Sequence, residues 1–76
     1  MIKLKIKVHG HLYWYAGKKW ELELDVKPEP IEKILEEIGI PLGEVSFVAK
    51  DSKKVELEYL PMDGDTLDVY PVVGGG

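Results

Sequence analysis

The sequence predicts a single α+β domain in which a four- to five-stranded sheet packs on one helix, and three patterns predict it. Apolar and polar residues alternate over residues 2–8 and again over 20–26, which is the period of a half-buried strand. Apolar residues recur at helical spacing over residues 31–38. A short alternating run at 66–70 then precedes a proline and the final glycines. We therefore expect a domain over residues 1–71 and a flexible C-terminal tail over residues 72–76.

The first two predicted strands have complementary outer faces, cationic on the first and mainly anionic on the second. Their inward sides are Ile2, Leu4, Ile6 and Val8 in the first strand, and Trp20, Leu22, Leu24 and Val26 in the second. Opposite charges across neighbouring antiparallel strands contribute roughly 0.2–1 kcal/mol per pair. The pattern therefore favours a hairpin between these strands, and we interpret the lysines first as partners in it and only second as a binding patch.

The connection over residues 9–18 is long and rich in aromatic residues. Exposure of Tyr13, Trp14 and Tyr15 together would indicate an interaction site. In the alternative that we favour, some of these rings lie beneath the hairpin and Trp20 joins the core. His9 and His11 could share one face and bind a metal, but the sequence has no cysteine and no third histidine. We therefore interpret both histidines as solvated loop residues.

A short helix is predicted after Pro28, with Pro30 at its first position, where the missing N–H costs nothing. Its apolar stripe faces the sheet and consists of Ile31, Ile34, Leu35 and Ile38. Gly39 is expected to end the helix in the left-handed conformation, with Ile40 making an apolar contact and Pro41 preventing continuation. A helix of about two and a half turns is not stable alone and must pack on the sheet.

Two further strands are predicted in the middle of the chain. Residues 45–50 are apolar on both sides around Phe47, which favours a central strand. Residues 51–54 are expected to form a turn, and residues 55–57 a short strand. Tyr59 and Leu60 follow, and we expect them to seal one end of the core.

The last predicted strand follows a turn signal at residues 63–65 and stops at Pro71, which cannot donate a hydrogen bond to a sheet. Leu67 and Val69 are expected on one side of this strand, and Thr66, Asp68 and Tyr70 on the other. The chain is therefore expected to leave the sheet at Pro71 and to continue as a free arm.

The glycines at the end of the chain have two interpretations. Chain ends are often frayed, but residues without Cβ atoms can also enter a channel too narrow for other side chains. At full extension residues 72–76 reach about 17 Å, far enough to place the C-terminal carboxylate in a partner's active site. The candidate reactive group is the carboxylate of Gly76. The candidate partner-binding residues are Tyr70, Pro71, Val72, Val73, Gly74 and Gly75.

Composition excludes several classes of function. The 76 residues carry a net charge of −4, which makes nucleic acid an unexpected partner. With no cysteine there is neither a disulfide framework nor a cysteine zinc site, and no metal is expected. No signal peptide or membrane segment is recognised, so a cytoplasmic protein with no membrane partner is expected. The abundance of Lys and Glu, with no Asn, Gln, Arg or Cys, is a pattern associated with hyperthermophile proteins.

Catalytic constellations are also missing from the sequence. Ser46 and Ser52 fall in a predicted strand and a predicted turn, and no glycine-rich phosphate loop precedes a helix. Asp63 and Asp65 flank a glycine, which suits a turn better than acid–base chemistry. We therefore interpret the chain as a substrate or carrier for other enzymes rather than as an enzyme.

The order of elements, with a glycine tail after the last strand, resembles the ubiquitin-like β-grasp fold with its mixed sheet. Within that fold the chain is most similar to the MoaD/ThiS sulfur carriers, closest to the MoaD family, the small subunit of molybdopterin synthase. Three segments carry the resemblance, namely Ala16-Gly17, Asp63-Gly64-Asp65, and Tyr70-Pro71-Val72-Val73-Gly74-Gly75-Gly76. The sequence departs from MoaD-like chains at Tyr13-Trp14-Tyr15, where they usually carry charged residues, and at Asp51-Ser52, where they usually have an Asn-Gly turn.

The resemblance implies a function for the tail. A MoeB/ThiF-like adenylating enzyme would use ATP to adenylate Gly76, and sulfur from a persulfide would convert it to a thiocarboxylate. The tail would then donate sulfur for molybdopterin in a MoaE-like large subunit, and this chain would bind no cofactor itself. The alternatives are a ThiS-like carrier for thiamine synthesis, a ubiquitin-like modifier joined through Gly76 to lysines, and a structural adaptor, which leaves the glycines unexplained.

Overall fold

The structure is a computed structural model that describes residues 1–73, and it confirms the α+β β-grasp class. Five strands and three short helical segments follow one another along the chain. The strands are β1 (Ile2–Val8), β2 (Glu21–Val26), β3 (Val45–Lys50), β4 (Lys53–Val55) and β5 (Thr66–Pro71). The helical segments are α1 (Leu12–Tyr15), α2 (Ile31–Glu37) and the 3₁₀ turn η1 (Leu42–Glu44).

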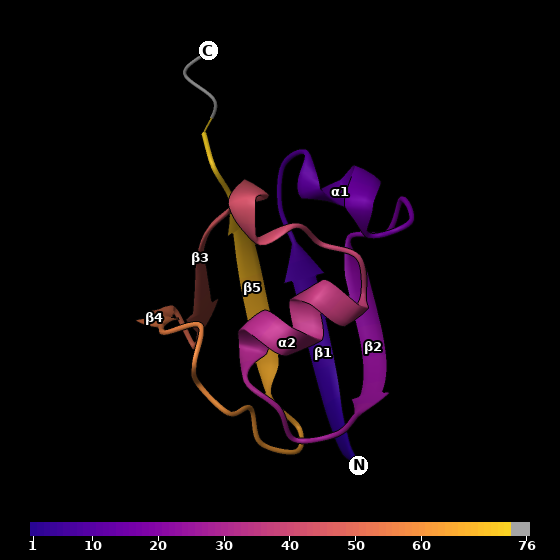
Figure 1. The fold of residues 1–76 in the computed structure, drawn as a ribbon, viewed down its shortest axis with the longest axis vertical. Coiled ribbons are helices and arrows are strands. Elements are labelled where there is room, and N and C mark those ends of the chain that lie inside the picture. The colour runs from indigo at the N-terminus through magenta and orange to yellow at the C-terminus, as the bar shows by residue number, and fades with distance from the viewer. Residues whose placement is uncertain (74–76) are drawn as a thin grey trace.

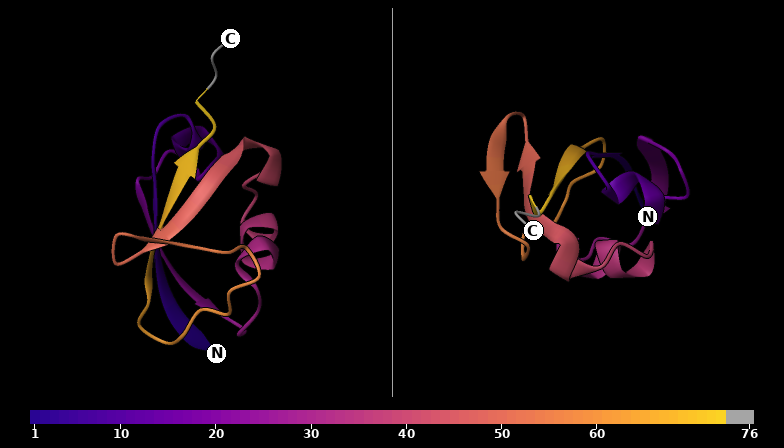
Figure 2. Two further views of the ribbon diagram at one scale, coloured as in Figure 1. Left: turned by 90° about the vertical axis from the view of Figure 1, so that its left-hand side faces the viewer. Right: turned by 90° about the horizontal axis from the view of Figure 1, so that it is seen from above.

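The strands form one mixed sheet in the order β2-β1-β5-β3-β4. β1 and β5 run parallel, and the other neighbouring pairs are antiparallel. α2 lies across one face of this sheet, and α1 lies at the end where β5 finishes (Figures 1 and 2). The last strand of the chain is therefore the middle strand of the sheet. β3 is an interior strand as expected, but the central strand of the sheet is β5.

The β1–β2 hairpin confirms the prediction made from its charges. The register places Lys3, Lys5 and Lys7 opposite Asp25, Glu23 and Glu21 respectively. The ammonium of Lys7 lies 3.8 Å from the carboxylate of Glu21. Both side chains of that pair are about half exposed, so the pair contributes no more than about 1 kcal/mol and mainly helps to set the register. The lysines of β1 therefore lie opposite the acidic residues of β2, as the charge pattern predicted.

The core lies between the sheet and α2, and it contains the apolar positions that the alternation predicted. The buried side chains include Leu4, Ile6, Val8, Ile31, Ile34, Leu35, Ile40, Val48, Leu67 and Val69. Trp20 is an exception, because it precedes β2 and remains 57% exposed. The expectation that Trp20 joins the core was therefore wrong. Leu12 and Ala16, from either end of α1, take part in the core instead.

The predicted helix is confirmed, with small changes at its ends. α2 covers seven residues, and Pro30 precedes it as the N-cap residue rather than lying in its first turn. Gly39 adopts the predicted left-handed conformation, with φ of +87°. The amide of Ile40 donates to the carbonyl of Leu35, and the Ile40 side chain is fully buried. The predicted capping contact is therefore present.

The segment after β3 differs from the prediction. The turn consists of Asp51 and Ser52, both with positive φ, and β4 begins directly after it at Lys53. The short strand therefore lies two residues earlier than expected, because these residues hydrogen-bond to β3 as a tight hairpin. Tyr59 packs against the core as predicted, whereas Leu60 is exposed and does not seal it.

A polar network joins the end of β3 to the start of β5. The Lys50 ammonium lies 3.1 Å from Asp65 Oδ1 and donates to the Tyr59 hydroxyl, which in turn donates to Asp65 Oδ2. Burial acts to raise the pKa of Asp65, but the Met62 amide, the Lys50 ammonium and the Tyr59 hydroxyl together hold it below its usual value. Hydrogen bonds to Tyr59 and Asp65 raise the pKa of Lys50.

We expect Asp65 to make stability fall in acid. Because its folded pKa lies below an unfolded value of about 3.9, its contribution is present above roughly pH 4 and is lost as pH falls through the folded pKa. At pH 7, Asp65→Asn should cost about 1–3 kcal/mol, because Lys50 loses its charged partner. Urea unfolding at pH 7 and pH 3 measures both effects. The difference between parent and Asp65→Asn should shrink at pH 3, and an equal difference at the two pH values contradicts the prediction. Asp51→Asn, in an exposed turn, is the control.

Candidate functional site at the root of the C-terminal tail

β5 carries the chain to the candidate site, and its end forms the root of the tail. Pro71 is the last residue of β5 and lies opposite Val45 of β3. The chain is held for one more residue, because the amide of Val72 donates to the carbonyl of Glu44, 3.0 Å away. Val73 is 90% exposed. The sheet therefore ends at Pro71 as expected, and one further backbone hydrogen bond, at Val72, holds the start of the arm.

The reactive end of the predicted tail lies outside the described residues. Gly74, Gly75 and Gly76 belong to that part, so the roles assigned to them stay predictions, as does the division of the chain at residue 71. Within the described part, Tyr70, Pro71, Val72 and Val73 follow one another from the sheet to the exposed arm. The sequence prediction placed the partner-binding residues in this segment.

Tyr70 lies in the middle of a row of stacked rings. His9 stacks on one side of it, with ring centroids 4.4 Å apart and planes 6° from parallel. Phe47 stacks on the other side, at 4.7 Å and 19°. Leu67 and Val69 face the core, so Tyr70, which alternates with them, belongs to the sheet face opposite α2. The row of rings thus crosses from the end of β1 over β5 to β3.

Three consecutive residues, His9, Gly10 and His11, surround the root, and we call them the collar. His9 Nε2 lies 3.0 Å from Asp68 Oδ1 on β5. His11 Nε2 lies 3.2 Å from Glu44 Oε2. The collar therefore contacts β5 directly and also contacts Glu44, the residue whose carbonyl accepts the amide of Val72.

Both histidines lie in the connection and are about two-fifths exposed, as interpreted, but each also has a carboxylate partner, and His9 stacks on Tyr70, which the sequence did not indicate. The two partners come from different elements, so the imidazoles do not converge on one point. Among residues 1–73, no three His, Cys, Asp or Glu side chains form a group suited to a metal ion.

Gly10 fits the collar against Pro71. A Cβ at position 10 would lie only 2.8 Å from Pro71 Cγ, and the backbone there has φ of +57°. We expect Gly10→Ala to lower the free energy of unfolding by about 1–3 kcal/mol, since it combines backbone strain with overpacking against a rigid ring. Gly43→Ala is the matched control, because a Cβ there meets no atom within 4 Å. Urea titration compares the two variants, and equal midpoints would contradict this packing.

The aromatic connection contains the short helix α1 instead of an extended loop. Its Leu12 is fully buried, which fixes the helix to the core. Tyr13 is partly buried, whereas Trp14 and Tyr15 are exposed. Trp14 and Tyr15 are therefore not covered, Tyr13 is covered only in part, and the alternative of an exposed aromatic site gains support.

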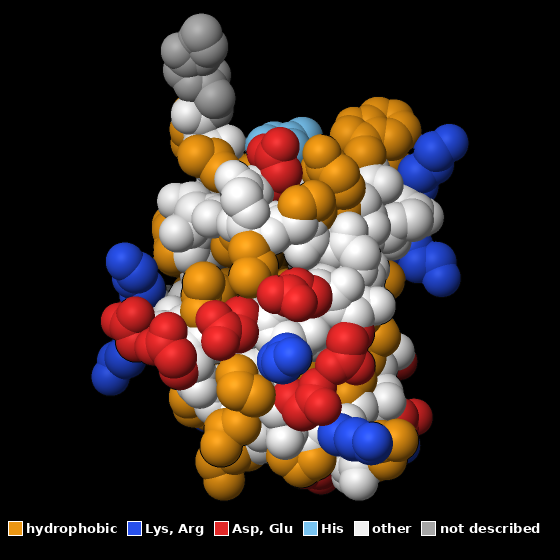
Figure 3. Space-filling model, viewed as in Figure 1, with side chains coloured by type: hydrophobic (Ala, Val, Ile, Leu, Met, Phe, Trp, Pro, Cys, Tyr) orange, Lys and Arg blue, Asp and Glu red, His pale blue; other side chains and the backbone are white. Residues whose placement is uncertain are grey.

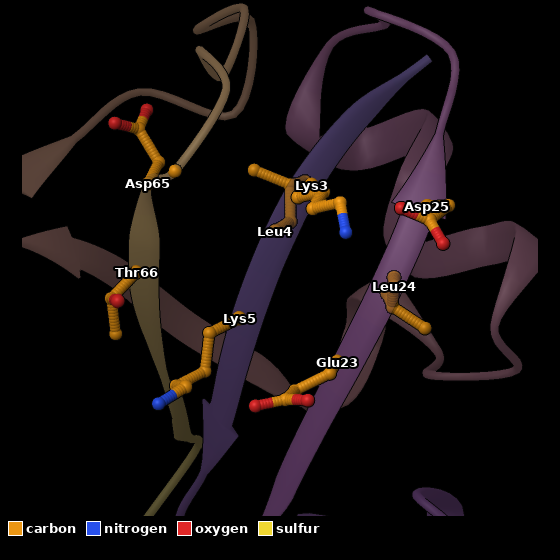
Figure 4. Close-up of a pocket in the computed structure, with 9 residues that line it drawn as sticks. Lys3, Leu4, Lys5, Glu23, Leu24, Asp25, Asp65 and Thr66 are labelled. Carbon is orange, nitrogen blue, oxygen red and sulfur yellow. The ribbon is translucent and has the colours of Figure 1, made fainter.

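A hollow of about 480 Å³ lies on the sheet at the other end of β5. Figure 4 shows Lys3 and Lys5 of β1 between Glu23 and Asp25 of β2 and Thr66 of β5. Thr66 begins β5 and Pro71 ends it, so the hollow and the tail root lie at opposite ends of the strand. Its charged residues are those of the hairpin together with Asp65, whose carboxylate already pairs with Lys50 and Tyr59, and they form no arrangement that activates a nucleophile.

Similarity to a known family agrees with this architecture. The family model described as Mut7-C ubiquitin matches residues 20–74, which is well over half of the chain. The chain belongs to the Mut7-C ubiquitin family. No curated protein shows significant similarity to it.

Solved structures show that this member of the Mut7-C ubiquitin family shares its fold with other small ubiquitin-like proteins. SAMP1 from Haloferax volcanii is 19% identical, with a TM-score of 0.72, over 97% of this chain and 99% of that one. A Pyrococcus furiosus protein, provisionally described as molybdopterin converting factor subunit 1, is 23% identical, with a TM-score of 0.75, over 96% and 100%. Urm1 from Trypanosoma brucei is 16% identical, with a TM-score of 0.72, over 97% and 95%. The resemblance to the ubiquitin-like carriers is thus confirmed at the level of fold.

Sequence reasoning identified the strand and the root but missed the residues around them. His9, Gly10 and His11 were assigned to a loop, and neither Glu44 nor Phe47 was connected with the tail. One available signal was the glycine between two histidines directly after a strong strand, because glycine often marks a close approach of backbone. The partners of the collar lie on other elements and leave no local pattern.

Proposed function

We propose that this Mut7-C ubiquitin domain is a sulfur carrier whose reactive group is the carboxylate of Gly76. The observation that supports it most is the tail root. The root is held by strand pairing of Pro71 and by the Val72 amide, Val73 after it is 90% exposed, and Figure 1 shows β5 pointing toward the end of the domain at which the chain leaves it. A rigid domain that presents an extended terminus is suited to place that terminus in another protein's active site. Within residues 1–73, no helix is long and apolar enough to cross a bilayer.

The chemistry requires other proteins. A free α-carboxyl has a pKa of about 3.5, so it is ionised and unreactive at neutral pH until ATP activates it. A MoeB/ThiF-like enzyme joins the Gly76 carboxylate to AMP and releases pyrophosphate. The terminal sulfur of a persulfide displaces AMP, and a thiol then reduces the resulting acyl disulfide to the thiocarboxylate. This chain contains no cysteine, so the persulfide and the thiol both come from partners. ATP is bound by the activating partner, and this chain binds no cofactor.

The acceptor that we propose is a MoaE-like large subunit that inserts the sulfur into molybdopterin. The Pyrococcus furiosus protein with the same fold is described as a subunit of molybdopterin converting factor, which supports this choice. Sulfur transfer for thiamine synthesis is the alternative within the same chemistry. The partner therefore determines the pathway. A pterin-binding enzyme that co-purifies with the chain indicates molybdopterin synthesis, and a thiazole-forming enzyme indicates thiamine synthesis.

A protein modifier is the second candidate function. A Haloferax volcanii protein with the same fold is described as small archaeal modifier protein 1. In that function Gly76 ends in an isopeptide bond to a lysine of another protein. The sulfur carrier is favoured because most lysine side chains are protonated at neutral pH and are poor nucleophiles, whereas a persulfide is a strong one.

Intact-mass analysis tests the proposal. The chain is purified from its host, or incubated with its activating enzyme, ATP and a sulfur donor. The carrier function predicts a chain that ends at Gly76 and gains the mass difference between sulfur and oxygen. The modifier function predicts adducts of Gly76 with other proteins. A terminus that is adenylated but never becomes a thiocarboxylate when sulfur is abundant refutes the carrier function.

We expect partners to contact the sheet beside the tail root. Tyr70 presents an aromatic ring there, and Val72 is partly exposed next to it. Tyr70→Ala and Val72→Asp should each weaken binding to the large subunit by about 30-fold, as interface anchors do. Calorimetric titration measures this, with Leu60→Ala at the other end of the domain as the control. Binding equal to that of the parent would place the interface elsewhere.

A further inference from the structure

We propose that Tyr13, Trp14, Trp20, Lys18 and Lys19, together called the aromatic surface, form a second docking site for the enzyme that activates Gly76. This inference rests on the proposed function. The activating enzyme is the one partner assigned to this surface. The patch on that enzyme is expected to have an apolar centre, which contacts the rings, and carboxylates at its rim, which contact the lysines. Neither the fold nor the chemistry of the tail requires this surface.

The three rings form a continuous exposed cluster. Tyr13 lies between the two tryptophans, with its ring centroid 5.3 Å from that of Trp14 and 4.4 Å from that of Trp20. Trp14 is 66% exposed, and Trp20 is 57% exposed. Large apolar side chains that gather at a surface cost solubility and usually mark an interaction site. Tryptophan and tyrosine are also the residues that most often carry interface energy.

The cluster is held in place rather than loosely attached. Leu12 and Ala16, on either side of the rings of α1, are both buried in the core. The amide of Lys18 donates to the carbonyl of Tyr13, 3.0 Å away. Lys18 itself has φ of +64°, a conformation that is unfavourable for a residue with a side chain. The Lys18 ammonium lies 5.8 Å from the centroid of the Trp14 ring, so the strained backbone keeps a cation beside the rings.

The aromatic surface is continuous with the tail root through the collar. The collar leads directly into α1, and it contacts Pro71 and Glu44 at the root. Figure 1 shows α1 at the same end of the domain as the tail root, where β5 finishes. In Figure 3 the histidine side chains lie between the tail root and an apolar area that has lysines beside it. An enzyme that receives the tail therefore approaches the end of the domain that also carries the rings.

Charge indicates the chemistry of the partner patch. The protein is acidic overall, with a net charge of −4, yet Lys18 and Lys19 stand next to each other and are both exposed. Within residues 1–73 neither of them forms an ion pair, whereas Lys7 on the neighbouring strand pairs with Glu21. Two cations beside exposed rings favour carboxylates on the partner, and they disfavour a second copy that brings the same lysines.

The test measures binding of the recombinant activating enzyme to the full chain without ATP, so that it does not depend on the chemistry. The double variant Trp14→Ser/Trp20→Ser should raise Kd by about 30-fold or more. Leu60→Ser/Met62→Ser is the matched control, because these side chains are also exposed and precede β5, at the end away from the tail. Thermal unfolding of each variant confirms that the fold is retained.

A charge-reversal pair tests the lysines. Lys18→Glu/Lys19→Glu should weaken binding and reduce its dependence on salt, because a rim charge steers association. Lys53→Glu/Lys54→Glu, on the edge strand β4, makes the same change in net charge far from the rings and should leave Kd close to that of the parent.

The outcomes separate the two proposals. If the variants bind weakly, as expected, while the parent binds but never yields a thiocarboxylate, the aromatic surface stands and the sulfur carrier function fails. Equal Kd values for parent and Trp14→Ser/Trp20→Ser overturn the inference, and so does a parent that does not bind the enzyme. A parent that sediments as a dimer, while the tryptophan variant is monomeric, assigns the surface to a second copy and also overturns it.

Discussion

Gly75→Val should abolish activation of the tail while leaving the stability of the domain unchanged. A β-branched side chain at this position blocks a channel shaped for glycine, and a misplaced terminus loses about 100-fold or more in rate. Gly75 follows the exposed Val73 and lies outside the described residues, so the expectation rests on the sequence and on the proposed function. ATP–pyrophosphate exchange and intact-mass analysis measure activation, and urea unfolding measures stability.

Three comparisons make this experiment specific. Gly75→Ala should give a smaller loss than Gly75→Val, because the effect depends on the size of the side chain. Gly43→Ala, where a Cβ meets no neighbour, should be activated as the parent is. A residue appended after Gly76 should also prevent activation, since it removes the reactive carboxylate. Normal thiocarboxylate formation in Gly75→Val would show that the tail does not enter a narrow channel.

Leu35→Ala should have the largest effect on stability among the changes considered. Leu35 lies on α2, is fully buried, and packs in the core between helix and sheet. Removing its branched end loses apolar contacts and leaves a cavity, which costs about 2–5 kcal/mol. A domain of this size has a total stability of roughly 4–11 kcal/mol. The midpoint of thermal unfolding should therefore fall by roughly 10–30 °C.

Leu60→Ala provides the matched control, because it makes the same chemical change at a side chain that is 55% exposed. Its effect should stay within about 0.5 kcal/mol. Calorimetry or circular dichroism measures both unfolding midpoints. Similar losses in the two variants would mean that α2 does not cover the core as described.

The tail root was predictable only in part. Alternation of Leu67 and Val69 with polar residues, followed by Pro71, identifies the strand, because side chains two positions apart share a face in any strand. The stacking of His9 on Tyr70 has no such local signal, because it depends on β1 and β5 lying side by side. The segments that meet there are about 60 positions apart in the chain, as the His9–Asp68 pair shows.

The sequence by itself determined the elements, the hairpin and the apolar side of each element. The lysine and acid faces of β1 and β2 encode their pairing, and the spacing of Ile31, Ile34 and Leu35 encodes the face of α2. These features depend on residues that are near in the chain, or on the matching of two faces. Only the tertiary structure decided that β5 lies at the centre of the sheet, that the collar surrounds the root of the tail, and that Trp14 and Trp20 face solvent. Periodicity fixes which side of a strand is apolar, but the order of strands is fixed by how all the apolar faces are buried at once.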